Sequence, residues 1–109
     1  MTRLTEAAML CGVSTDEIQI WIAESWVMPA RSPDDDWHFS EVDLARTRLI
    51  RELEQDLGVN RDAMPVVLSL LDQVHGLRRR LRALARGMAD LSEEQRRRFL
   101  AVAEAPEPR

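Results

Sequence analysis

An apolar seven-residue repeat in the second half of the chain most constrains its fold. Apolar residues recur at two positions of each heptad, three residues apart: Val67, Val74, Leu81 and Met88, then Leu70, Leu77, Leu84 and Leu91. A repeat sustained over about four heptads predicts a coiled coil, and a helix over 61–86 would be roughly 40 Å long. The rest of this short chain cannot cover so long a stripe, so we expect a homodimer. Its interface would comprise Val67, Leu70, Val74, Leu77, Leu81 and Leu84.

The first 25 residues predict two short helices joined by a glycine turn. Apolar spacing places the first helix over 4–11, with Thr5 as its N-cap and Gly12 as its C-terminal stop. Ser14 or Thr15 would cap the second helix, which carries apolar residues at i, i+3 and i+4 from Ile18. A helix, a glycine-containing turn and a second helix are the signature of a helix-turn-helix.

The middle of the chain predicts a small wing and a third helix. Residues 26–29 and 37–39 have the pattern of short strands that could pair as a hairpin. Ser40 would then cap a third helix that stops at Gly58. We expect Asn60 to cap the fourth, long helix and Gly87 to break or bend it.

These patterns predict the fold class and the boundaries of the domains. Glycine and proline are sparse, with four and five copies, which favours an all-α protein over a multi-turn β fold. We expect a winged helix-turn-helix-like head over 1–58 and a coiled-coil dimerisation helix over 59–91. A short C-terminal helix and tail would follow over 92–109.

Charge is distributed unevenly along the chain. Thirteen acidic residues and six arginines give residues 1–64 a net charge of −7, whereas residues 65–109 carry +3, so that the whole chain carries −4. There is no lysine. The chain therefore has an acidic head and a mildly basic tail, and this asymmetry is the first indication of its function.

The sequence offers no residues for catalysis, for a cofactor or for a metal site. The two histidines, His38 and His75, have no cysteine or carboxylate at ligand spacing, and no glycine-rich phosphate loop occurs. The single cysteine, Cys11, fits a small buried apolar residue. No apolar run resembles a signal peptide or a membrane span, so we expect a cytoplasmic protein that is not an enzyme.

The element order from Leu4 to Leu57 resembles the winged head of the MerR family. The Gly12-Val13-Ser14 turn and the helix entry from Phe39 to Leu44 carry this resemblance. It implies a DNA-binding head and a long helix that pairs antiparallel in a dimer. However, a helix that reads a DNA groove needs basic residues for phosphates, and residues 14–25 contain none. The sign of the charge argues against DNA binding by this head and favours a basic protein partner.

The sequence is similar to the CbpM family of chaperone modulatory proteins, which have this charge. The similarity runs from about residue 4 to residue 84. Its main segments are Gly12-Val13-Ser14-Thr15-Asp16-Glu17-Ile18, Val27-Met28-Pro29, Trp37-His38-Phe39, 48–53, 56–60 and 67–72. The resemblance implies a dimer that binds the J-domain of CbpA or a DnaJ-like co-chaperone. It also implies that this binding prevents the J-domain from engaging DnaK.

We expect the partner to contact acidic residues around the second helix and the wing: Asp16, Glu17, Glu24, Asp34, Asp35, Asp36 and Glu41. Trp26 could be an aromatic anchor for that partner, because tryptophan is enriched at binding hot spots, or it could pack in the core.

The alternative function is a MerR-like transcriptional regulator that contacts DNA through arginines such as those at 46, 48 and 51 or at 78–80.

Overall fold

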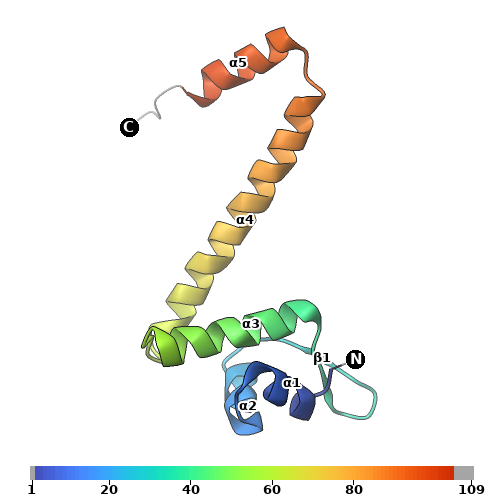
Figure 1. Ribbon diagram of the computed structural model, residues 1–109, viewed down its shortest axis with the longest axis vertical. Coiled ribbons are helices and arrows are strands. Elements are labelled where there is room, and N and C mark those ends of the chain that lie inside the picture. Colours follow the sequence, from blue (N-terminus) through green and yellow to red (C-terminus); the bar gives the residue numbers. More distant parts are fainter. Residues whose placement is uncertain (1, 105–109) are drawn as a thin grey trace. The chain divides into compact units, whose positions relative to one another are not determined.

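The structure, a computed structural model, describes residues 2–104 (Figure 1). It consists of helices and one two-stranded sheet, which confirms the predicted all-α fold with a long helix. The chain forms two compact units, one up to Ser69 and one from Leu70 onward. The head lies in the first unit, and the long helix begins there and continues into the second.

The first two helices and the turn between them form as the sequence predicts. Helix α1 spans Leu4–Cys11 and ends at Gly12, which has a φ of 71°. Helix α2 spans Thr15–Ala23, and Ser14 caps it through a hydrogen bond from the Glu17 backbone N–H to the serine hydroxyl. The prediction of Thr5 as the N-cap of α1 is wrong. The N-cap residue is Arg3, whose backbone oxygen accepts the N–H of Ala7.

The wing hairpin is present, but its first strand is not where we predicted it. Strand β1 is Ala30–Arg31 and pairs antiparallel with β2, Trp37–His38. Residues 26–29 are not a strand, because the Trp26 backbone N–H still bonds to the Trp21 oxygen in the turn that ends α2. Phe39 instead bridges to Thr2, so the N-terminal segment also pairs with the wing.

The third helix, α3, spans Glu41–Arg51 and begins with the predicted cap at Ser40. A π-helical turn, η1, follows over Glu52–Asp56, which the sequence did not predict. The helical path then ends at Gly58, as predicted, where φ is 67°.

The core of the head lies where α1, α2 and α3 meet. Helix α1 packs against both α2 and α3, and Figure 1 shows α1 and α2 on the same side of α3. The fully buried apolar residues include Ile18 and Ile50, from α2 and α3. Cys11 is buried as expected, and this burial raises the pKa of its thiol. All the buried apolar side chains of the described chain belong to this first unit.

The two C-terminal helices differ from the prediction only in their boundaries. Helix α4 spans Met64–Ala89, and α5 spans Glu93–Ala103. Asn60 caps the turn that leads into α4: its side chain accepts the N–H of Ala63 at 2.8 Å, and its backbone oxygen accepts the N–H of Met64, the first residue of the helix, at 3.0 Å. Gly87 does not break the helix, which continues for two more residues. The predicted cap of the last helix by Ser92 is confirmed.

We expect Gly12→Ala and Gly76→Ala to change the stability of the fold in opposite directions. Gly12 adopts the left-handed conformation, in which a Cβ atom costs about 1 kcal/mol or more. Gly76 lies inside α4 with open space around its Cα, so alanine there should add up to about 1 kcal/mol of helix propensity. Urea denaturation at one fixed protein concentration measures both effects. Equal shifts in the same direction would contradict the role assigned to Gly12.

Candidate partner-binding surfaces

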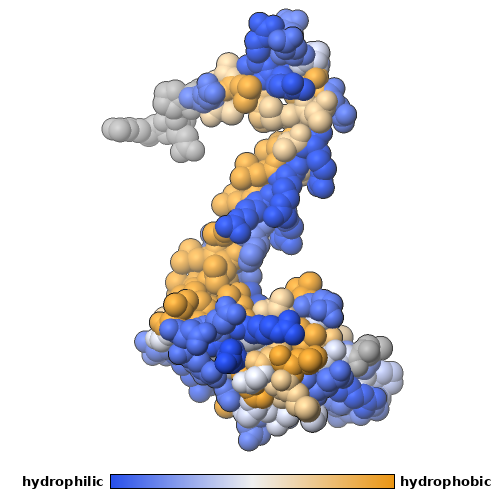
Figure 2. Space-filling view, viewed as in Figure 1, coloured by the Kyte–Doolittle hydropathy of each residue, from blue (hydrophilic) through white to orange (hydrophobic). Residues whose placement is uncertain are grey.

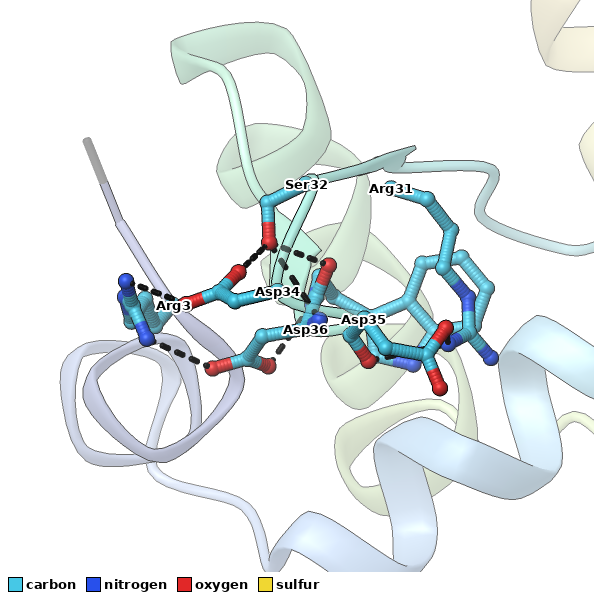
Figure 3. Close-up of polar contacts among 7 residues, drawn as sticks. Arg3, Arg31, Ser32, Asp34, Asp35 and Asp36 are labelled. Carbon is cyan, nitrogen blue, oxygen red and sulfur yellow. Dashed lines mark hydrogen bonds and ion pairs between the residues drawn. The ribbon is translucent and has the colours of Figure 1, made fainter.

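The wing loop holds its own acidic residues in place (Figure 3). The guanidinium of Arg3 makes an ion pair with Asp34 at 2.7 Å and a longer one with Asp36 at 3.5 Å. The hydroxyl of buried Ser32 donates to Asp34, and Asp36 accepts the backbone N–H of Trp37 at 2.7 Å. Two of the three predicted loop contacts are therefore already engaged within the head.

The hydrogen bond from Ser32 and the charge of Arg3 hold the pKa of the Asp34 carboxyl below its usual value. Asp34 therefore stays ionised over a wider range of pH than an isolated aspartate. Its contribution to the fold is present above the pKa of the unfolded chain and is lost only as the pH falls through the lower folded value.

The third loop acid, Asp35, makes an ion pair with Arg31, four residues earlier in the chain. The same guanidinium lies over the ring of Trp37, with 4.3 Å from its central carbon to the ring centroid. Cation–π contacts of this kind favour arginine. Arg31 therefore ties the tip of the wing to its second strand, and a partner would have to compete with it for Asp35.

Two further predicted contacts have partners within the head. Glu24, at the C-terminal end of α2, makes an ion pair with Arg61. Glu17 completes the capping box of α2, because its carboxylate accepts the hydroxyl and the backbone N–H of Ser14 at 3.1 and 3.3 Å. Each of these acids therefore has a structural role beside any role in binding.

Asp16 and Glu41 are the predicted contact residues that remain available. Both are exposed, and neither makes an ion pair or a side-chain hydrogen bond within residues 2–104. They occupy the first turns of α2 and α3, where the positive end of the helix dipole favours acids. The sequence alone did not distinguish these two acids from the other five predicted contact acids, which have partners within the head.

The sequence analysis missed an apolar residue beside Asp16. Ile20 is 45% exposed and follows Asp16 by four residues on α2, so the two side chains lie on one face of that helix. Gln19 and Ala23 are exposed beside them. Helical spacing could have predicted that Ile20 is exposed, because it places Ile20 on the side of α2 opposite the buried Ile18. We call Asp16, Gln19, Ile20 and Ala23 the α2 outer face.

Trp26 lies in the core rather than on the surface. It is only 5% exposed, and its backbone oxygen accepts a hydrogen bond from the side chain of Arg46 at 2.8 Å. A ring this buried cannot be an anchor for a partner unless the head opens. The structure therefore favours core packing, the alternative role for this residue.

Along α4, apolar and basic side chains occupy different faces of the helix, and Figure 2 shows orange along one side and blue along the other. Val67 is half-buried, whereas the five other residues of the predicted interface are 40–64% exposed: Leu70, Val74, Leu77, Leu81 and Leu84. No described residue from Leu70 onward is buried. Contiguous exposed apolar surface of this kind marks an interaction site.

The described part of the chain has no group of three or more histidine, cysteine or acidic residues placed to hold a metal ion. None of its helices combines the length and the apolar character that crossing a membrane requires.

Comparison with known families agrees with this architecture. The family described as MerR HTH family regulatory protein matches residues 2–86, which is most of the chain. The chain therefore belongs to this family of helix-turn-helix regulatory proteins, and the resemblance of its head to the MerR family is confirmed.

Within that family the chain is CbpM-like. It is 33% identical over 60 residues to the chaperone modulatory protein CbpM of Coxiella burnetii strain Dugway 5J108-111, and equally to that of strain RSA 331 / Henzerling II. The match covers 55% of this chain and 57% of each relative, so it spans little more than half the length of these curated relatives.

Proposed function

We propose that this protein is a chaperone modulator that binds the J-domain of a CbpA-like or DnaJ-like co-chaperone. By occupying the J-domain it prevents that co-chaperone from engaging DnaK. The proposal extends to this chain the role that the name of its relatives, chaperone modulatory protein, gives them.

The charge of α2 is the observation that carries the proposal. In a DNA-binding helix-turn-helix the second helix enters the groove and needs basic residues. Here α2 and its flanks contain Asp16, Glu17 and Glu24 and no basic residue. Such a helix repels phosphates, whereas it attracts the basic helix that J-domains present.

The α2 outer face is the part of the head best suited to this contact. It combines Asp16, an acidic residue that makes no ion pair within residues 2–104, with an exposed apolar residue, Ile20. A basic amphipathic helix could pair its charge with Asp16 and cover Ile20. The acids at 34–36 add a longer-range negative potential, but Arg3 and Arg31 already occupy them.

The second part of the proposal is a homodimer formed through α4. Its apolar stripe is exposed from Leu70 to Leu84, and none of the described residues of the second unit is buried. Pairing two such stripes buries them as a coiled-coil seam. A dimer would present two heads to the co-chaperone.

Titration calorimetry with an isolated DnaJ-like J-domain, at a low and a high salt concentration, tests the proposal. We expect binding that weakens with salt, because exposed charges are screened. If the J-domain does not bind at either salt concentration, the proposal is wrong. Sequence-specific DNA binding by the head would then support the alternative, a MerR-like regulator.

Asp16→Arg should weaken J-domain binding by about tenfold or more, because it replaces an attraction by a repulsion worth over ~1.4 kcal/mol. Asp16 accepts no capping bond, so the helix should remain folded. Asp90→Arg is the matched control, since it makes the same change of charge in the turn after α4. If both variants bind the J-domain equally well, the α2 outer face is not the contact.

A further inference from the structure

We propose that a row of arginines on the polar face of α4 binds the phosphate backbone of a nucleic acid without reading its sequence. This site lies in the second unit and is independent of the proposed function of the head. The residues are Arg78, Arg79, Arg82 and Arg86, which are all exposed. We call them the α4 arginine row.

Helix geometry places these four side chains together. Successive residues of an α-helix are rotated by about 100° around its axis. On this basis the four arginines span an arc of roughly 100°, and the centre of this arc lies about 130° around the axis from the centre of the apolar stripe. They would therefore remain accessible when a second copy covers the stripe. From Arg78 to Arg86 the row is roughly 12 Å long, a length over which a duplex presents about seven phosphates.

Among the described residues, the arginines of the row have no acidic partners. The helix contains no acidic residue between 73 and 89, and none of the four makes an ion pair within residues 2–104. Arg78, Arg82 and Arg86 are instead spaced by four, so that like charges face each other along the helix. This arrangement disfavours the free helix, and an anion bound along the row would relieve the repulsion.

Helix α5 contains three consecutive arginines, as α4 does at 78–80, but each arginine of α5 contacts another group of the chain. Arg97 makes an ion pair with Glu93, Arg98 pairs with Glu94 at 2.8 Å, and Arg96 donates to the backbone oxygen of Met88. Two of the three arginines on α5 are therefore neutralised by acids of the same helix, whereas none of the α4 row makes an ion pair within residues 2–104. The contrast assigns a binding role to the row on α4 rather than a general solvated surface.

The composition of this face favours a nucleic acid over an acidic protein. Its other exposed residues are small or polar, such as Ala83, Ala85 and His75. A protein interface usually depends on buried apolar or aromatic anchors, and this face has none. It offers charge alone, which suffices for a phosphate backbone. The planar guanidinium also matches the phosphate oxygens in a bidentate way.

Fluorescence anisotropy of a short random-sequence DNA duplex tests this inference, with the full chain titrated at several salt concentrations. The test variant is Arg78→Gln with Arg82→Gln and Arg86→Gln. The control variant replaces Arg96, Arg97 and Arg98 by glutamine, which removes the same charge from α5. Circular dichroism and J-domain binding check that both variants keep their fold and their head function.

We expect the wild-type chain to bind the duplex at low salt. The α4 variant should lower the slope of log K against log salt by about three, at roughly 0.9 for each phosphate that the variant no longer neutralises. The α5 variant should change that slope by less than about one. If the wild-type chain does not bind, or if both variants lose affinity equally, the inference is wrong.

Discussion

Leu77→Asp is expected to abolish the proposed homodimer at micromolar concentrations. Leu77 lies in the middle of the apolar stripe and is 55% exposed in the single chain, so a paired α4 would bury it. Two carboxylates without partners in that seam should cost about 3 kcal/mol or more. This raises the dissociation constant at least about a hundredfold. Light scattering on size-fractionated protein measures the result directly.

Ala83→Asp provides the control for this experiment. It introduces the same charge into the same helix, at an exposed position away from the apolar stripe. This variant should remain dimeric. If Leu77→Asp also remains dimeric, the stripe is not the interface, and something other than a second copy must cover it.

Ile50→Ala should strongly destabilise the head. Ile50 is 0% exposed and lies on α3, which packs against α1. Removing a buried isoleucine side chain to Cβ leaves a cavity and typically costs about 2–5 kcal/mol. A domain has only about 5–15 kcal/mol of stability in total. A large fall in the urea midpoint is therefore expected, read from the fluorescence of the buried Trp21 and Trp26.

Val42→Ala, on the same helix, should change the unfolding free energy by less than about 0.5 kcal/mol, because Val42 is 77% exposed. Both variants must be compared at one protein concentration, since dimerisation would add to apparent stability. Similar losses for Ile50→Ala and Val42→Ala would mean that the core is not where the structure places it.

The local features of this protein could be predicted from the sequence because they depend on neighbours in the chain. The caps at Ser14, Ser40 and Ser92 each use a residue three positions later. The end of α1 at Gly12 depends on the freedom of one residue to adopt a positive φ. The apolar stripe on α4 follows from helical periodicity alone. These signals were sufficient for the order of the elements and the fold class.

The sequence was less accurate wherever the backbone departs from regular structure. The wing strand was placed at 26–29, whereas Trp26 belongs to the turn after α2 and the strand starts at Ala30. The π-helical turn after α3 has no sequence signal that we recognise. Buried aromatic side chains in turns resemble strand residues, because both are apolar and bounded by polar residues.

Only the tertiary structure decided which acids of the head are available to a partner. The sequence establishes the charge of the head, and from this charge we predicted a basic partner. It does not show that Arg3 reaches Asp34 and Asp36, or that Arg61 reaches Glu24. The members of these pairs lie more than thirty residues apart in the chain. Such contacts depend on how the elements pack, whereas caps and helix faces are set by residues within a few positions of each other.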